Sequence, residues 1–125
     1  LTTVLANRAI PGEDGLIYFT RPAHDGILVF DPTSGSDEII VPDLPAERWQ
    51  SWAISKSWLV YVSQVTNGGQ VVIRKNLKHN NNEIVTSFAP DTVGGTIEVS
   101  SDGNILFFTR TDRADLDIKM IDLKK

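Results

Sequence analysis

Three observations predict an all-β protein of the β-propeller type, made of about three four-stranded antiparallel meander blades. A strand-like segment occurs three times along the chain, and its copies are spaced as the blades of a propeller are. Each copy is followed by a short polar turn and by a second strand-like run rich in Val, Ile and Phe, which suit a half-buried pleated sheet. No segment has the character of a helix of useful length. Together these features predict a partial propeller.

The repeated segment begins at residues 15, 58 and 104 and has an aromatic residue near its centre. Tyr18 of the first copy corresponds to Tyr61, 43 residues later, and Tyr61 corresponds to Phe107, 46 residues further on. Gly26 and the pair Gly68-Gly69 lie in the turns that follow the first two copies, where a hairpin requires a positive φ. The copies are residues 15–21, 58–64 and 104–110, and the second runs are residues 27–31, 71–75 and 117–123.

The remaining strands complete two units and leave the third one short. Outer strands are expected after a further turn in the first two copies, and inner strands are expected ahead of the second and third. The third copy stops before an outer strand. Thr2 to Ala6 is expected to be either the inner strand of the first unit or an outer strand elsewhere. The single propeller segment 1–125 therefore divides into units of approximately 1–44, 45–90 and 91–125, with outer strands at 38–41 and 83–88 and inner strands at 51–55 and 96–100.

Three blades do not close a ring, because propellers typically have four to eight. The missing blades are expected either from a longer parent chain or from a second copy. A homodimer would complete a six-bladed ring, with each missing outer strand supplied by the partner's N-terminus. The alternative fold is a three-unit antiparallel sandwich whose hairpins resemble one another.

Composition and charge exclude several classes of function. The chain of 125 residues has no cysteine, which removes zinc–cysteine sites, disulfides and thiol nucleophiles and leaves the compartment open. Twelve Lys and Arg against sixteen Asp and Glu give a net charge of −4, so no nucleic-acid binding is expected from this segment. The longest apolar stretches, 58–62 and 105–108, are far too short to insert in a membrane. Because residue 1 is Leu and no leader is visible, the chain is expected to derive from a longer one.

Residues 99–110 followed by 117–123 resemble the TolB-like repeat, in which serine, any residue and aspartate-glycine precede a β run, an aspartate-isoleucine pair and a second β run. Here Ser100, Asp102-Gly103 and Asp117-Ile118 match that pattern. Ser101 departs from it where many repeats have proline, and so does Lys56-Ser57-Trp58, which replaces a glycine-containing turn. The resemblance covers residues 47–125 well and the first unit more loosely.

Residues 48–54, with Trp49 and Trp52, together with residues 59–62, also resemble the C-terminal propellers of CadC/ToxR-like bacterial winged-helix transcriptional regulators. Those proteins have an N-terminal DNA-binding domain and usually one membrane helix. The resemblance implies a sensory segment of such a regulator, facing the periplasm, with a cytoplasmic location left open. A TolB-like periplasmic interaction protein is the related alternative.

No catalytic, metal or cofactor site is predicted. The sequence contains no phosphate-binding loop, no dinucleotide fingerprint and no glycine-flanked serine elbow. His24 and His79 fall in loops of different types and are expected at opposite faces. The acidic run at Asp112, Asp115 and Asp117 lacks the spacing of a calcium loop and includes Arg113, so it is interpreted as a solvated turn.

These observations favour a non-catalytic module that binds a protein or a small molecule on its loop-rich face. The competing hypothesis is the propeller domain of a hydrolase or peptidase-like enzyme, since fold does not fix function. Among the tryptophans, Trp52 is expected in the core, Trp58 partly exposed, and Trp49 the most exposed. The candidate binding residues are Arg21, His24, Asp25, Arg48, Trp49, Asp91, Arg110, Asp112 and Arg113.

Overall fold

The computed structural model describes residues 5–64, 68–90, 92–112 and 115–123. From residue 110 to residue 118 it describes the backbone alone. Within these ranges the chain forms eleven β-strands in three antiparallel sheets and one short 3-10 helix, and no α-helix. It divides into two compact units, residues 1–49 and 50–125. Among the described residues, no helix is long and apolar enough to cross a membrane.

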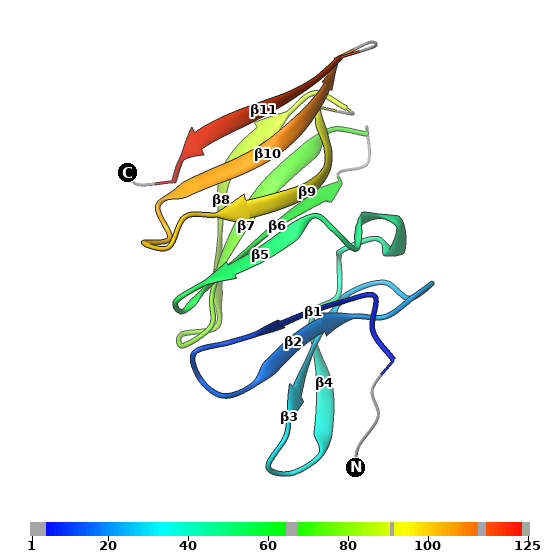
Figure 1. Cartoon of the computed structure of the whole chain (residues 1–125), viewed down its shortest axis with the longest axis vertical. Helices are drawn as coiled ribbons and strands as arrows, with labels where there is room; N and C mark the ends of the chain where they lie inside the picture. Colours follow the sequence, from blue (N-terminus) through cyan, green and yellow to red (C-terminus); the bar gives the residue numbers. More distant parts are fainter. Residues whose placement is uncertain (1–4, 65–67, 91, 113–114, 124–125) are drawn as a thin grey trace. The chain divides into compact units, whose positions relative to one another are not determined.

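The first unit contains one four-stranded meander, which we call sheet A (Figure 1). Ile17–Thr20 and Ile27–Asp31 form its centre, and the side chains of Tyr18, Phe19 and Leu28 are buried. A 3-10 helix, η1 (Ala46–Arg48), follows the sheet. The strands, in spatial order, are β1 (Arg8–Pro11), β2 (Ile17–Thr20), β3 (Ile27–Asp31) and β4 (Ser36–Val41).

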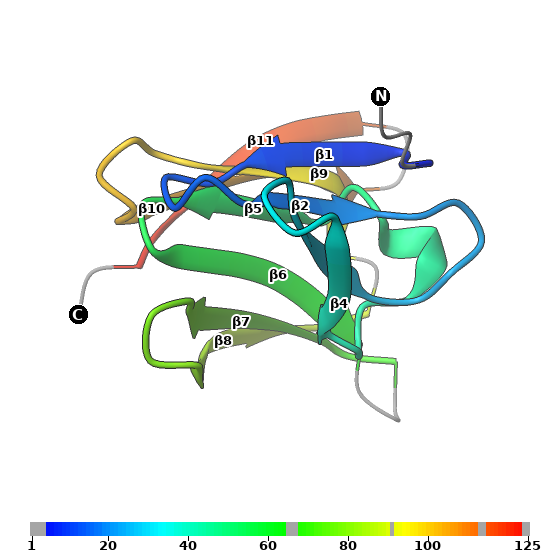
Figure 2. The same ribbon diagram turned by 90° about the horizontal axis from the view of Figure 1, so that it is seen from below.

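The second unit contains sheet B, with four strands, and sheet C, with three. In both views their first strands, β5 and β9, lie side by side (Figures 1 and 2). Sheet B consists of β5 (Trp52–Ser55), β6 (Trp58–Gln64), β7 (Gln70–Asn76) and β8 (Asn81–Phe88), and sheet C of β9 (Val93–Val99), β10 (Ile105–Asp112) and β11 (Asp115–Asp122).

The core of the second unit lies between the facing sides of sheets B and C. Alternate residues of each strand point into it, which is the period of a pleated sheet. The rings of Phe88 on β8 and Phe108 on β10 meet with centroids 5.4 Å apart. The buried residues of this core are Ala53, Val60, Val62 and Val72 from sheet B and Val93, Ile97, Leu106, Phe108 and Leu123 from the C-terminal part.

The strands agree with the predicted meanders, with three differences. The first strand of sheet A is Arg8–Pro11, whereas a strand was predicted at Thr2 to Ala6, of which residues 2–4 lie outside the described part. The predicted polar loop 111–116 is largely strand, because β10 continues to Asp112, which pairs with Asp115. Of the two turn glycines at 68 and 69, only Gly68 has a positive φ. The segment 111–116 had been assigned to a loop from its polar residues, which the strands of a hairpin can also carry.

Candidate functional site

Two segments meet at the end of sheet A where β2 and β4 finish. The loop joining β2 to β3 and the connection after β4 are linked by the Gly26 amide, which donates to the carbonyl oxygen of Leu44 at 2.7 Å. The Ala46 amide donates to Oδ1 of Asp25 at 2.9 Å. The Leu44 side chain is buried, so packing holds the connection in place in addition to the two hydrogen bonds. We call this pair of segments, residues 21–26 and 42–49, the loop end of sheet A.

Gly26 permits the close approach of these segments. Its φ is +100°, a conformation that residues with a Cβ rarely adopt. A Cβ placed there would lie 2.8 Å from the carbonyl oxygen of Val41. A glycine is therefore required at this turn both for its backbone angle and for the space beside it.

Arg21 is fixed at the loop end by two neighbours. Its Nη2 donates to Oδ2 of Asp37 at 2.8 Å, and its Cζ lies 5.7 Å from the centroid of the Phe19 ring. Both partners of the ion pair are more than a third exposed, so the pair contributes only about 0–1 kcal/mol. Its main effect is to orient the guanidinium, and Asp37 is a partner that the sequence interpretation did not assign.

His24 and Asp25 have different roles in the same loop. The His24 ring is exposed, and its Nδ1 lies 2.9 Å from the carbonyl oxygen of Pro22. Asp25 was predicted as a binding residue, but one of its carboxylate oxygens accepts the Ala46 amide. The structure therefore gives Asp25 a positioning contact and leaves the His24 ring facing solvent.

Arg48 and Trp49 lie at the end of η1. The helix begins after Pro45, whose φ of −61° suits the entry to a helical turn, and the Arg48 amide donates to the Pro45 carbonyl at 2.9 Å. Both side chains are half-buried, so Trp49 is less exposed than expected. The other tryptophans agree with the prediction, since Trp52 is fully buried and Trp58 half-buried.

The remaining predicted site residues cannot be placed with this group. Asp91 and Arg113 lie outside the described residues, as do the side chains of Arg110 and Asp112. The backbone of Arg110 pairs with Val93 and Asp117 within sheet C. Of the nine predicted binding residues, the structure therefore brings together the five that belong to the first unit: Arg21, His24, Asp25, Arg48 and Trp49.

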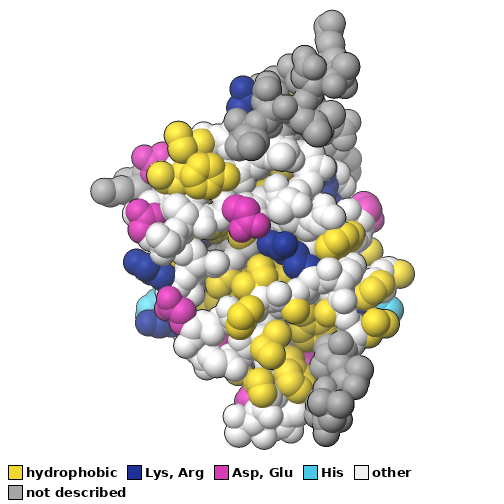
Figure 3. All heavy atoms as spheres, viewed as in Figure 1, with side chains coloured by type: hydrophobic (Ala, Val, Ile, Leu, Met, Phe, Trp, Pro, Cys, Tyr) yellow, Lys and Arg dark blue, Asp and Glu magenta, His cyan; other side chains and the backbone are white. Residues whose placement is uncertain are grey.

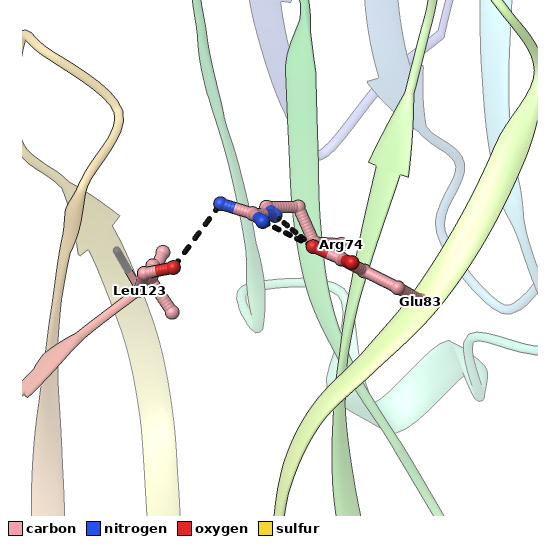
Figure 4. Close-up of polar contacts among 3 residues, drawn as sticks. All are labelled: Arg74, Glu83 and Leu123. Carbon is pink, nitrogen blue, oxygen red and sulfur yellow. Dashed lines mark hydrogen bonds and ion pairs between the residues drawn. The ribbon is translucent and has the colours of Figure 1, made fainter. Parts of the chain in front are cut away.

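A second polar cluster, which sequence reasoning missed, lies between sheets B and C (Figure 4). Arg74 on β7 donates through Nε to Oε1 of Glu83 at 2.7 Å and through Nη1 to the carbonyl oxygen of Leu123 at 3.3 Å. Its Cζ lies 4.3 Å from the centroid of the Trp58 ring. Arg74 and Glu83 are cross-strand partners. The sequence could have indicated this pair, because both residues follow from the strand register set by the turn at residues 77–80.

This cluster is structural in character. The adjoining pocket has a volume of only about 130 Å³ and is lined by Arg74, Glu83, Ile84, Val85 and Leu123. The guanidinium is already engaged by a carboxylate, a ring and a backbone carbonyl. It therefore connects the outer strands of sheet B to the end of β11 and has little capacity left for a ligand.

A shallow pocket of about 280 Å³ on sheet A is lined by Leu16, Val29 and four polar residues, Asp31, Ser36, Asp37 and Glu38. Two of its carboxylates have intramolecular partners: Asp37 bonds to Arg21, and Asp31 accepts the Thr33 amide at 2.9 Å. Among the described residues, no three His, Asp or Glu side chains are grouped so as to hold a metal ion.

Two titratable groups with shifted pKa values lie outside the loop end, Tyr18 on β2 and Asp102 in the turn between β9 and β10. Burial, followed by a hydrogen bond to Asp14 at 2.6 Å, raises the pKa of the Tyr18 hydroxyl. Hydrogen bonds from the Ser100 hydroxyl and the Asn104 amide lower the pKa of Asp102. The hydrogen bonds involved are local, since Tyr18 bonds to Asp14 and Asp102 bonds to Ser100 and Asn104.

No protein-family model matches the sequence, and no curated protein matches it. Among solved structures, the chain is similar to TolB from Acinetobacter baumannii, with a TM-score of 0.58 and 21% identity over 90% of this chain and 25% of TolB. It is also similar to a protein from Bacteroides fragilis named as a 6-phosphogluconolactonase, with a TM-score of 0.50 and 14% identity over 94% of this chain and 39% of that one.

These likenesses show the fold. Together with the three antiparallel sheets, they confirm the predicted all-β fold of the propeller type and the TolB-like character of its repeats. This chain spans a quarter of the TolB chain and less than half of the Bacteroides protein.

Proposed function

We propose that this TolB-like propeller segment is a non-catalytic binding module, and that the loop end of sheet A binds a protein or small-molecule partner. The observation that carries the proposal is the pair of hydrogen bonds that joins residues 21–26 to residues 42–49. They fix two loops that would otherwise be independent, so less conformational entropy is lost when a partner binds. An oriented guanidinium, an exposed imidazole and a half-buried indole then belong to one fixed surface.

The side chains at this end suit recognition more than chemistry. Trp and Arg are enriched among residues that dominate binding interfaces, because they combine large contact area with directional polar groups. A nucleophile would need a base within hydrogen-bond reach. Nδ1 of His24 faces the carbonyl oxygen of Pro22. This nitrogen is therefore not positioned to act as a base for a hydroxyl group.

The experiment is a selection from a displayed random-peptide library, followed by affinity measurement with the selected peptide. Arg48→Ala combined with Trp49→Ala should weaken binding at least tenfold without lowering the unfolding temperature by more than a few degrees. The matched control is Lys78→Ala with His79→Ala, an adjacent cation and ring in the exposed turn between β7 and β8. His24→Ala provides a second test, because its exposed ring can be removed without disturbing the fold.

Two results would contradict this proposal. Peptides that bind the double variant as well as the original chain would place the binding surface elsewhere. Turnover of ester, peptide or glycoside substrates that is abolished by His24→Ala would make the module an enzyme.

We further propose that the parent protein is a bacterial transcriptional regulator and that the module lies in the periplasm. This proposal rests on the resemblance of residues 48–54 and 59–62 to regulator propellers. An antibody against this chain should detect a membrane-associated native protein much heavier than 13.8 kDa, and protease added to spheroplasts should digest the epitope. A native protein that has no DNA-binding domain would instead support the alternative, a TolB-like periplasmic interaction protein.

A further inference from the structure

The last strand of sheet A contains one residue more than the strand beside it. Ile27 and Leu28 are consecutive on β3, but their partners on β4 are Val41 and Ile39. Ile40 of β4 therefore has no residue opposite it on β3. This arrangement is a β-bulge, which leaves one residue out of the ladder, bends the strand and increases its twist.

The last strand of sheet B has the same irregularity at a corresponding place. Val72 and Ile73 are consecutive on β7, and their partners on β8 are Thr86 and Ile84, so Val85 is the extra residue. In the described chain, the one other irregular pairing, that of β9 with β10, has its extra residues on β9, which is also an edge strand. The extra residues therefore lie on strands at the margins of the sheets.

The bulges of β4 and β8 each adjoin an exposed isoleucine. Ile39 is 59% exposed and Ile84 is 70% exposed, and each directly precedes the extra residue of its strand. Figure 3 shows hydrophobic side chains at the surface over sheet A. In the described chain, β4 and β8 are paired on one side only. A strand with an unpaired edge and exposed apolar side chains is a template to which a strand of another molecule can add.

The bulges divide these two strands into short regular runs. Stacking of strands from many chains requires segments of about six or seven residues. Because β4 has 6 residues and β8 has 8, either strand would reach this length if it were regular. With the bulges, the longest regular runs are residues 36–39 and 81–84, which are shorter than such a segment.

We propose that the bulges at Ile40 and Val85 keep β4 and β8 from pairing with a β-strand of another molecule. At a bulge the amides and carbonyls along the edge lose their regular spacing, so a strand that pairs before the bulge is out of register beyond it. The interruption lies beside Ile39 and Ile84, where an added strand would gain apolar contacts. This role concerns the edges of the sheets and is independent of the binding proposed for the loop end of sheet A.

Deleting the extra residue tests the proposal, because every other residue of the strand keeps its partner in the register. At about 200 μM, the variant that lacks Val85 should have a weight-average mass by light scattering at least fivefold that of the original chain, and it should bind thioflavin T. The variant that lacks Ile40 should do the same through sheet A. Val85→Ala and Ile40→Ala are the matched controls, since they keep the bulge, and they should retain the mass of the original chain.

A charge on the same strand provides the second test. Adding Ile84→Lys to the Val85 deletion should return the mass to that of the original chain, because a lysine on an edge strand opposes strand addition. Deletion variants that retain both their β-sheet circular dichroism and the original mass would overturn the proposal. Aggregation that Ile84→Lys does not reduce, or that the alanine variants share, would also overturn it. Loss of β-sheet circular dichroism in both deletion variants would count against it too, since the extra residues would then be required for folding.

Discussion

The side-chain amide of Gln70 exchanges two hydrogen bonds with the backbone of Val93. Its Oε1 accepts the Val93 amide at 2.7 Å, and its Nε2 donates to the Val93 carbonyl at 3.2 Å. Gln70 is the first residue of β7, and Val93 is the first residue of β9, so a side chain of sheet B completes the backbone pairing of sheet C. The Gln70 side chain is fully buried, which makes the pairing expensive to break.

Replacing Gln70 by Leu should lower the free energy of unfolding by about 2–4 kcal/mol, because two buried backbone groups lose a partner that leucine cannot replace. Urea denaturation would measure this change. Gln64→Leu, at an exposed position on the adjacent strand, is the control and should change stability by less than about 0.5 kcal/mol. Equal effects at the two positions would show that the Val93 contact contributes little. Gln70→Glu should regain part of the lost stability at acidic pH, where a protonated carboxyl can donate again.

Arg74→Ala should loosen the end of β11, because it removes the contact of the guanidinium with the Leu123 carbonyl and its stacking on Trp58. We expect a loss of about 1–2 kcal/mol in unfolding free energy and faster hydrogen exchange at the Leu123 amide, which bonds to Asn104. Arg74→Lys should not restore slow exchange, since an ammonium cannot reach three partners in the fixed geometry of a guanidinium. Arg21→Ala removes a similar but exposed ion pair and should leave exchange at Leu123 unchanged.

The stability contributed by Asp102 should be lost in acid. The Ser100 hydroxyl donates to its Oδ1 at 2.6 Å and the Asn104 amide at 3.0 Å, and both bonds favour the ionised carboxylate. Because its pKa in the folded state lies below the ordinary value of 3.8, the contribution is complete above that value and disappears as pH falls through the folded pKa. Urea midpoints measured below pH 5 should therefore fall more steeply for the original chain than for Asp102→Asn. Parallel curves for the two proteins would contradict this assignment.

Gly26→Ala should destabilise the loop end of sheet A more than the same change at Gly35. Both glycines have positive φ angles, +100° and +75°, so both substitutions introduce backbone strain of about 1 kcal/mol. Only at Gly26 would the new Cβ also lie within 2.8 Å of a backbone oxygen, whereas the space around Gly35 is open. Thermal unfolding of the two variants would separate the steric effect from the strain, and the proposed binding of the loop end should weaken in Gly26→Ala alone.

The meander organisation could be predicted from the sequence because its causes are local. The repeated run around Tyr18, Tyr61 and Phe107 has the side chains that a pleated sheet favours, and glycines such as Gly26 lie where the chain must turn. Strands adjacent in the sequence pair in each sheet, so the order of strands followed from the order of segments. Strand boundaries were harder to predict, as the pairing of Asp112 with Asp115 shows, because polar residues that are typical of loops also occur in strands.

The side-chain contacts were decided only by the tertiary structure. Arg21 meets Asp37 across 16 residues, Gln70 meets Val93 across 23, and Arg74 meets Leu123 across 49. Each contact depends on the twist and stacking of sheets, and no local sequence pattern encodes these. The residues along the chain therefore sufficed to predict a series of antiparallel β-meanders. Which side chains gain partners and which face solvent depends on the folded structure, because long-range packing brings the partner of each polar group within reach.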